Sequence, residues 1–222
     1  MIVPSLRRER SLWNAGVRRI AGVDEVGVAP TSGAVVAAAV IMNAGCRRIP
    51  GVRDSKTLSA AQRERLYPII RRRAVAVGVG AASVPEIDRL NIYHASHLAM
   101  VRAFASLSPQ PAHALVDGNV VPKGLVVPAA TAIVKGDQRS LSIACASVIA
   151  KVWRDKHMEA LDASYPGYGF GAHKGYGTPA HLRALDALGP SVLHRGSFAP
   201  VAEALGRVAL RMAETALGGL GG

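Results

Sequence analysis

Two adjacent acids lie inside an otherwise apolar segment, IAGVDEVGVAPTSGAVVAAAVIM, which spans residues 20–42. Burying a charge is costly unless something positive compensates it, so Asp24 and Glu25 indicate a special environment. Neighbouring side chains of a regular strand point to opposite faces, and both acids can face one site only if the strand ends or bulges beside them. Gly27 supplies a possible break. The apolar run of residues 34–42 predicts a second strand, joined to the first as a hairpin.

The rest of the chain alternates between β-rich and helical patterns, which predicts an α/β fold. Further strands are expected at residues 74–83, 113–119 and 125–134, and helices at residues 59–73, 140–164, 179–188 and 201–217. Residues 84–107 are expected to form one or two helices. Acids stand at the ends of two of these strands, because Asp117 closes the run HALVD and Asp137 follows the next run. A carboxylate there can emerge into a cleft, although a turn that closes the strand explains Asp117 equally well in isolation.

The length of 222 residues is enough for one full hydrophobic core and does not require a second domain. We expect residues 1–200 to form one compact unit. Residues 201–222 should add a helix and a disordered glycine-rich tail to the same domain. Two isolated cysteines, Cys46 and Cys145, predict neither a zinc site nor a disulfide scaffold, and we expect buried or idle thiols.

The chain is strongly basic, with 27 Lys and Arg against 15 Asp and Glu and a formal net charge of +12. Such a charge favours a polyanionic partner, although from charge alone a merely solvated basic surface stays open. No apolar run approaches the ~18 uncharged residues of a membrane span. The arginine-containing N-terminus lacks the apolar core of a secretory signal. We therefore expect no membrane partner and a cytoplasmic location.

The glycine-rich segment GYGFGAHKGYGT, residues 167–178, carries interleaved aromatic and basic side chains. Aromatic rings can stack on sugars or bases while lysines meet phosphates, so a flexible nucleic-acid contact loop is one interpretation. A long surface loop without that role is the other. The residues concerned are Tyr168, Phe170, His173, Lys174 and Tyr176.

Four acids are expected at or near strand ends: Asp24, Glu25, Asp117 and Asp137. If they converge, their mutual repulsion raises their pKa values unless cations neutralise them. Oxygen ligands without His or Cys select Mg²⁺ or Mn²⁺ rather than zinc. Two such ions about 4 Å apart can cleave a phosphodiester in line. Together with the positive net charge, the acids predict a metal-dependent nuclease.

Seven motifs occur in the order and spacing of bacterial ribonuclease HII, so the chain resembles that family from about Ile20 to Val201. The motifs are GVDEVG, DSKTLS, VDGN, VKGDQRS, SIACASVIAKVWRD, YPGYGFGAHKGYGT and HRGSF. The resemblance implies an RNase H-like fold, a mixed five-stranded sheet flanked by helices, with residues 1–200 as the catalytic domain and a helical C-terminal extension. It implies endonucleolytic cleavage of the RNA strand in RNA/DNA hybrids, including single ribonucleotides in duplex DNA, as in ribonucleotide excision repair, leaving 3′-hydroxyl and 5′-phosphate ends. We expect a monomer.

Carried over motif by motif, the resemblance assigns both catalysis and metal binding to the four acids, Asp24, Glu25, Asp117 and Asp137. Tyr176 matches the tyrosine that stacks on the deoxyribose beside the ribonucleotide. Three lysines fall in motifs that lie near substrate phosphates: Lys56, Lys135 and Lys174.

One motif departs from the family, because the Gly-Arg-Gly that grips the ribose 2′-OH and its phosphate is replaced by Gly27-Val28-Ala29. Valine removes a guanidinium with its five donors, and Ala29 adds a Cβ where glycine allows close backbone approach or positive φ. We predict that the chain cleaves hybrids with runs of ribonucleotides but handles a lone ribonucleotide poorly. The related ribonuclease HIII group also lacks the arginine but carries an extra N-terminal domain.

Two other functions stay open at this point. A catalytically weak paralogue that binds hybrids would explain the altered loop but not four mutually repelling acids. A resolvase or integrase with the same kind of fold would explain the acids but neither DSKTLS nor HKGYGT.

Overall fold

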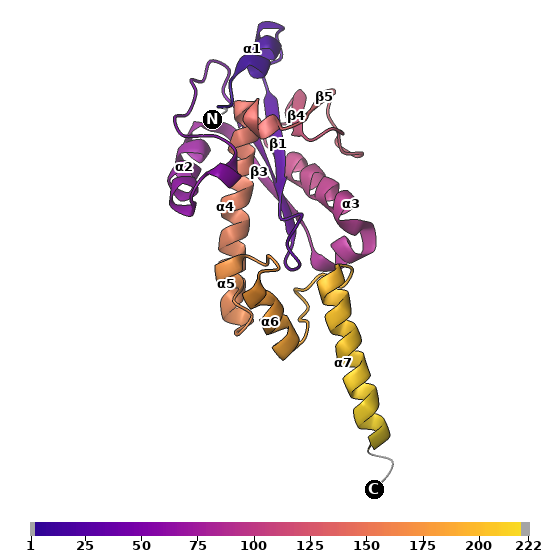
Figure 1. The fold of residues 1–222 in the computed structure, drawn as a ribbon. Helices are drawn as coiled ribbons and strands as arrows, with labels where there is room; N and C mark the ends of the chain where they lie inside the picture. Colours follow the sequence, from indigo (N-terminus) through magenta and orange to yellow (C-terminus); the bar gives the residue numbers. More distant parts are fainter. Residues whose placement is uncertain (1–2, 219–222) are drawn as a thin grey trace.

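A mixed five-stranded sheet forms the centre of the molecule (Figure 1), whose computed structural model describes residues 3–218. The strands are β1 (Ile20–Val26), β2 (Val35–Met42), β3 (Ala74–Ala82), β4 (His113–Asp117) and β5 (Ala129–Ile133). They lie in the order β3-β2-β1-β4-β5, antiparallel from β3 to β1 and parallel from β1 to β5. The predicted α/β class, the β1–β2 hairpin and the sheet are confirmed. The predicted disordered tail falls partly on residues 219–222, outside the described residues.

Helices follow the predicted order. They are α1 (Arg7–Asn14), α2 (Ala60–Arg73), α3 (Val84–Ala105), α4 (Leu141–Ser164), α5 (Phe170–His173), α6 (Pro179–Leu188) and α7 (Ala199–Gly218), with 3-10 turns η1 (Ser55–Thr57) and η2 (Gly136–Gln138). Ser59 caps α2 in a reciprocal capping box with Gln62, as its sequence position suggested. Sequence reasoning did not predict α1, nor the single turn α5 inside the glycine-rich segment.

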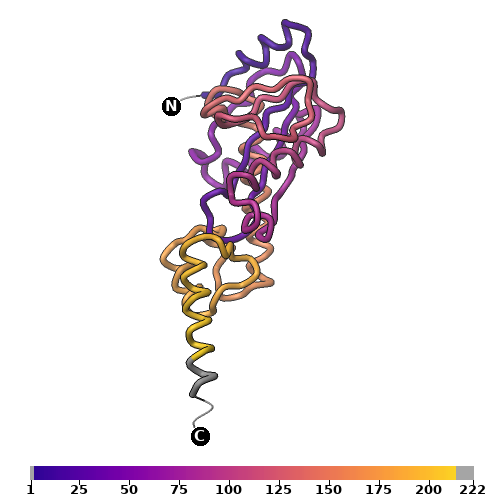
Figure 2. The backbone as a smooth tube through the Cα atoms, turned by 90° about the vertical axis from the view of Figure 1, so that its right-hand side faces the viewer, coloured from indigo at the N-terminus to yellow at the C-terminus, as the bar shows by residue number. Residues whose placement is uncertain are grey.

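Helices cover both faces of the sheet, and the alternation of side chains along β2 divides the core between them. Ala38, Val40 and Met42 pack on the side of α2 and α4, while Ala37 and Ile41 pack on the side of α3. Helix α7 leaves this body and extends away from it (Figure 2). Among the described residues, no helix combines the length and the apolar character that crossing a membrane requires.

Helix α4 lies close to β1, because small residues line the contact. A Cβ added at Gly22 would lie 2.2 Å from the backbone carbonyl carbon of Ser142, so only glycine fits beneath the helix. The buried residues Cys145, Ala146 and Ser147 continue this contact along α4. The close approach brings the Ser147 hydroxyl within reach of Asp24 on β1.

A buried acid fastens α1 to the start of α4. Glu9 has no exposed surface, and its Oε1 accepts hydrogen bonds from the Ser140 hydroxyl at 2.6 Å, the Ser142 hydroxyl at 2.8 Å and the Ser142 N–H at 2.9 Å. A carboxylate at a helix N-terminus also meets the positive end of the helix dipole. Glu9 thus caps a different helix with Oε1, while its buried Oε2 has no hydrogen-bond partner among the described residues.

Replacing Glu9 with alanine should lower the free energy of unfolding by about 1.5–3 kcal/mol, because three buried donors lose a charged acceptor. Denaturant unfolding followed by circular dichroism measures the change. Glu64→Ala, at an exposed position of α2, should shift it by less than about 0.5 kcal/mol. Equal effects of the two substitutions would contradict the role given to Glu9.

Candidate active site

Three of the predicted acids meet where β1 and β4 run side by side. Each of Asp24, Glu25 and Asp117 offers a carboxylate oxygen, and these oxygens lie within 4.8 Å of one another. Val23 pairs with Val116 in parallel register, which places the following residues, Asp24 and Asp117, next to each other. β1 ends one residue after Glu25, where the predicted break at Gly27 takes a φ of +90°. The sheet therefore assembles a carboxylate cluster at its strand ends.

Repulsion within this cluster shows in the pKa values. Burial raises the pKa of Asp24 well above its usual range, and the neighbouring Glu25 and Asp117 raise it further. Burial, then the charge of Asp117, raises the pKa of Glu25 to about 6. A hydrogen bond from Ser147 lowers the pKa of Asp24 but does not offset the other effects. The site thus needs positive charge when its acids are ionised.

The fourth predicted acid, Asp137, lies in η2 and adjoins the cluster without belonging to that group of three. The Gly136 N–H donates to Asp117 Oδ1 at 2.5 Å, which ties η2 to the end of β4. Burial raises the pKa of Asp137 to about 6, assisted by the charges of Asp54 and Asp117. Asp54 is an additional acid at the site, which sequence reasoning treated as part of a turn.

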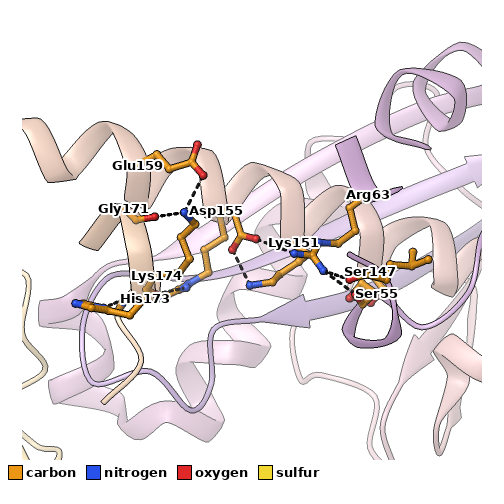
Figure 3. A network of polar contacts seen from close by, with 12 residues as sticks. Ser55, Arg63, Ser147, Lys151, Asp155, Glu159, Gly171, His173 and Lys174 are labelled. Carbon is orange, nitrogen blue, oxygen red and sulfur yellow. Dashed lines mark hydrogen bonds and ion pairs between the residues drawn. The ribbon is translucent and has the colours of Figure 1, made fainter. Parts of the chain in front are cut away.

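Of the three predicted lysines, only Lys56 faces the acids. Its backbone N–H donates to Asp54 Oδ1 at 2.9 Å, which forms η1, and its positive charge lowers the pKa values of both Glu25 and Asp137. Ser55 anchors the same turn through a 2.8 Å hydrogen bond between its Oγ and the Oγ of Ser147 on α4 (Figure 3). The turn that carries Lys56 is therefore held by two separate contacts, and its exposed side chain is near enough to act on the charges of Glu25 and Asp137.

The donor set fits hard divalent cations. Asp24, Glu25 and Asp117 supply oxygen atoms only, and no His or Cys joins them among the described residues. Such a set selects Mg²⁺ or Mn²⁺ over zinc. Divalent charge would offset the repulsion that raises the pKa values of these acids.

The loop of residues 27–34, between β1 and β2, is held by two buried arginines that sequence reasoning missed. Arg195 donates to the carbonyl oxygens of Gly27 at 2.6 Å, Val28 at 3.0 Å and Gly33 at 2.8 Å. Arg154 on α4 donates to the carbonyl oxygens of Ser32, Ala34 and Lys174 at 2.8–3.0 Å. Both guanidiniums are at most 1% exposed. The backbone of the loop is thereby fixed through its carbonyl groups.

Val28 and Ala29, the two residues that differ from the family motif, point outward from the loop. The Val28 side chain is 39% exposed, and Ala29 is exposed as well. Positive φ occurs at Gly27 and Gly33 of this loop but not at Ala29, so the extra Cβ of Ala29 meets no backbone strain. The role of the family's glycine at this position, close backbone approach or positive φ, stays a prediction, because this chain carries alanine there. A Cβ at Gly27, by contrast, would lie 2.3 Å from Nε of Arg154.

The segment that carries Tyr176 is joined directly to this loop. The Thr31 N–H donates to the Gly175 carbonyl at 3.0 Å, and the Thr31 carbonyl accepts the Arg195 N–H at 2.9 Å. The Tyr176 ring is 39% exposed, and the Lys151 ammonium lies 5.7 Å from its centroid. Tyr176 is thus presented to solvent beside the altered loop.

The other two predicted lysines differ from Lys56. Lys135 is exposed and has a left-handed backbone, with φ +53°, at the turn before Asp137. Lys174 is partly buried, and its ammonium pairs with Glu159 at 2.8 Å and donates to the Gly171 carbonyl (Figure 3). A phosphate contact by Lys174 would therefore compete with an existing ion pair.

Two aromatic residues of the glycine-rich segment are not available for nucleic-acid contact. Phe170 is fully buried and Tyr168 is 9% exposed, and their rings stack with centroids 5.3 Å apart against Met158. The interpretation that they stack on a ligand is wrong. A helical turn, α5, turns them into the core because Gly169 takes a positive φ of +77°.

Two histidines, His181 and His194, form a hydrogen-bonded pair beside Tyr176. His181 Nδ1 lies 2.9 Å from the Tyr176 carbonyl, to which it must donate, and His181 Nε2 must then accept from His194 Nε2 at 3.1 Å. The His173 ring stacks on His181 with centroids 4.2 Å apart, and its Nδ1 accepts the Gly175 N–H at 3.1 Å. His181 and His194 are neutral in this arrangement. Burial, then the charge of His181, lowers the pKa of His194 to about 4.

Comparison with known proteins gives a consistent result. Residues 21–201 match the family model described as ribonuclease HII. A ribonuclease HII of Geobacillus thermodenitrificans is 53% identical over 201 residues, which are 90% of this chain and 76% of that protein. The crystal structure of ribonuclease H2 from Pyrococcus horikoshii superposes with a TM-score of 0.73 at 26% identity, covering 85% of this chain and 98% of the other. Bst-RNase HIII in complex with Mn²⁺ shares the fold, with a TM-score of 0.64 at 20% identity over 86% of this chain and 70% of that one.

Adding Mn²⁺ or Mg²⁺ should raise the unfolding temperature of this chain, because the ion binds only where folding has gathered the acids. A concentration 100 times the Kd should stabilise it by about 2.7 kcal/mol, which differential scanning fluorimetry detects. Asp117→Asn should reduce the shift strongly, whereas Asp186→Asn, a surface acid paired with Arg207, should leave it intact. A shift that survives Asp117→Asn unchanged would place the ion elsewhere.

Stability should also depend on His194. Its pKa is lowered in the fold, so the unfolded chain binds a proton there that the folded chain does not, and His194 contributes a loss of stability as pH drops from about 6.5 to about 4. This contribution is about 1.4 kcal/mol per pH unit. The raised pKa values of Glu25 and Asp137 act in the opposite direction in the same window, so the contribution of His194 is read from the difference between variant and wild type. His194→Gln should remove this contribution from the slope of unfolding free energy against pH. Exposed His94→Gln should not, and an unaltered slope in His194→Gln would refute the assignment.

Proposed function

Because the chain belongs to the ribonuclease HII family, it is a metal-dependent ribonuclease H, and we propose that it hydrolyses phosphodiesters of the RNA strand at a two-metal centre. The products would be 3′-hydroxyl and 5′-phosphate ends. The observation that carries the proposal is the convergence of Asp24, Glu25 and Asp117 at the ends of two parallel strands. Family membership supplies the substrate class, the RNA strand of RNA/DNA hybrids.

In this proposal the three clustered acids and Asp137 hold the ions. Mg²⁺ or Mn²⁺ bound there would activate a water molecule and stabilise the leaving oxygen. Asp117 is oriented for this task by the Gly136 N–H, and Asp24 by its hydrogen bond from the Glu25 N–H at 2.8 Å. Lys56 contributes a fixed positive charge that favours the ionised form of Glu25. The protein thus supplies preorganised carboxylates rather than a titrating acid or base.

The substrate would lie across the acids and against the joined loops of residues 27–34 and 175–176. Tyr176 is exposed enough to stack on a sugar, and Lys135 is exposed enough to meet a phosphate. Lys174 can do so only by exchanging its pair with Glu159. We therefore assign Tyr176 the principal positioning role and Lys174 a secondary one.

We further propose that a single ribonucleotide in duplex DNA is a poor substrate. The loop retains a fixed backbone through Arg154 and Arg195, but at Val28 it offers no guanidinium to the ribose or its phosphate. A hybrid with many ribonucleotides can offset the lost contact by offering many cleavage positions. The alternative, a binding protein with little activity, leaves unexplained why three repelling acids are kept within 4.8 Å.

The remaining parts of the proposal concern organisation. We propose that residues 1–200 form the catalytic domain, with α7 as its extension, and that the chain acts in the cytoplasm as a monomer. Its basic charge of +12 supports association with hybrids and with ribonucleotide-containing DNA duplexes.

Asp117→Asn should reduce hybrid cleavage by several orders of magnitude while leaving hybrid binding measurable. Cleavage of a fluorescent RNA/DNA hybrid in Mg²⁺ and in Mn²⁺, with Asp186→Asn as the matched control, provides the measurement. Wild-type protein that binds the hybrid without cutting it in either metal would favour the binding paralogue.

Introducing Val28→Arg together with Ala29→Gly should raise cleavage at a single ribonucleotide about 10- to 100-fold, the value of one charged contact. The exposed side-chain position leaves room for the new guanidinium. Val28→Lys with Ala29→Gly tests whether charge alone suffices, and should gain less because lysine lacks the planar fork. Equal kcat/KM of the wild type on single-ribonucleotide and all-RNA substrates would overturn the proposed preference.

A further inference from the structure

A basic hollow is lined by residues of α1, β4 and β5 and by Gln138 and Arg139. Figure 1 shows α1 and β5 at the same end of the molecule. Its volume is about 720 Å³, and it is open to solvent. Arg7 and Arg8 of α1 line it on one side and Arg139 on another, with Leu115 and Thr131 of the sheet between them. No Asp or Glu is among its lining residues.

Among the described residues, the three arginines that line this hollow have no partner. Within residues 3–213, no hydrogen bond or ion pair is formed by the guanidiniums of Arg7, Arg8 and Arg139, all of which are exposed. Exposed arginines without a partner also occur elsewhere in this part of the chain, for example Arg47 and Arg89, but these three gather around one hollow. Gathering three like charges without a counter-charge costs free energy unless an anion binds among them.

The hollow lies close to the catalytic acids along strand β4. Leu115 lies two residues before Asp117 on β4, so both face the same side of the sheet about 7 Å apart. Leu115 pairs with Thr131 on β5, and Arg139 follows Asp137 by two residues. At a rise of roughly 3.4 Å per nucleotide, a strand over Asp117 reaches the hollow in about two nucleotides.

We propose that this arginine hollow binds backbone phosphates of the nucleic-acid duplex, about two nucleotides from the bond that is cut. The inference rests on the proposed function, because the same duplex must occupy the acids. Guanidinium groups match phosphate oxygens with paired N–H donors. The Thr131 hydroxyl is already hydrogen-bonded to His113 Nε2 at 3.0 Å, so the arginines carry the contact. The contact would fix the position of the duplex and carry no sequence information.

The experiment compares the triple variant R7A/R8A/R139A with R71A/R72A/R73A, which removes three exposed arginines from the end of α2. The KM for a long RNA/DNA hybrid should rise about tenfold or more in the first variant relative to the second. The slope of log affinity against log salt should fall by about one for each lost phosphate contact. Unfolding temperatures of both variants confirm that they are folded.

Hybrids shortened from either end locate the contact. When the hybrid is shortened from the end that lies over the hollow to within about two nucleotides of the cleaved bond, the KM ratio of the two variants should approach one. Equal KM values on long hybrids, or a ratio independent of length, would overturn the arginine hollow as a phosphate site. Failure of the proposed function looks different, because the wild type would then cut no hybrid of any length.

Discussion

Repulsion between carboxylates at the ends of β1 and β4 is the constraint around which this molecule is arranged. Asp24 is 5% exposed and still lies within 4.8 Å of two other acids, so its ionisation is opposed by both burial and charge. The nearby compensation is small, a single hydroxyl from Ser147 and one ammonium from Lys56. A protein that keeps such a cluster has a use for the cations that it attracts.

Two buried arginines, Arg154 and Arg195, hold the loop of residues 27–34 by hydrogen bonds to backbone carbonyls. Among the described residues, neither Arg154 nor Arg195 pairs with a carboxylate, and each instead donates to three backbone carbonyls, most of them in the loop of residues 27–34. Burial, then the charge of Arg154, lowers the pKa of Arg195 to about 9, which still leaves it charged near neutral pH. The charge is tolerated because several carbonyl dipoles surround it. The same two residues connect the loop of residues 27–34 to the segment before Tyr176, so one rigid unit faces the substrate.

Sequence patterns were sufficient for whatever depends on local periodicity and local chemistry. The hairpin break at Gly27 and the strand ending at Asp117 follow from residue types alone. Three-dimensional partners were not predictable in this way. Phe170 looks like a loop aromatic but enters the core through a positive φ at the preceding glycine, and Glu9 looks like a surface acid but caps α4. The burial of Arg154 could have been predicted from its position in a helix that is otherwise rich in small buried residues.

Under the proposed function, the residues assigned to bond cleavage and those assigned to substrate choice are held by separate contacts. Arg195 holds the Val28 carbonyl and Arg154 holds the Ser32 carbonyl, so the path of the loop depends on backbone contacts and not on the side chain at position 28. A valine there alters what the loop offers a ribose without displacing the acids, because β1 is fixed independently by its pairing with β2 and β4. Specificity can therefore change at Val28 and Ala29 while the carboxylate cluster stays assembled. The retained acids and the altered loop are consequently compatible features of one working enzyme.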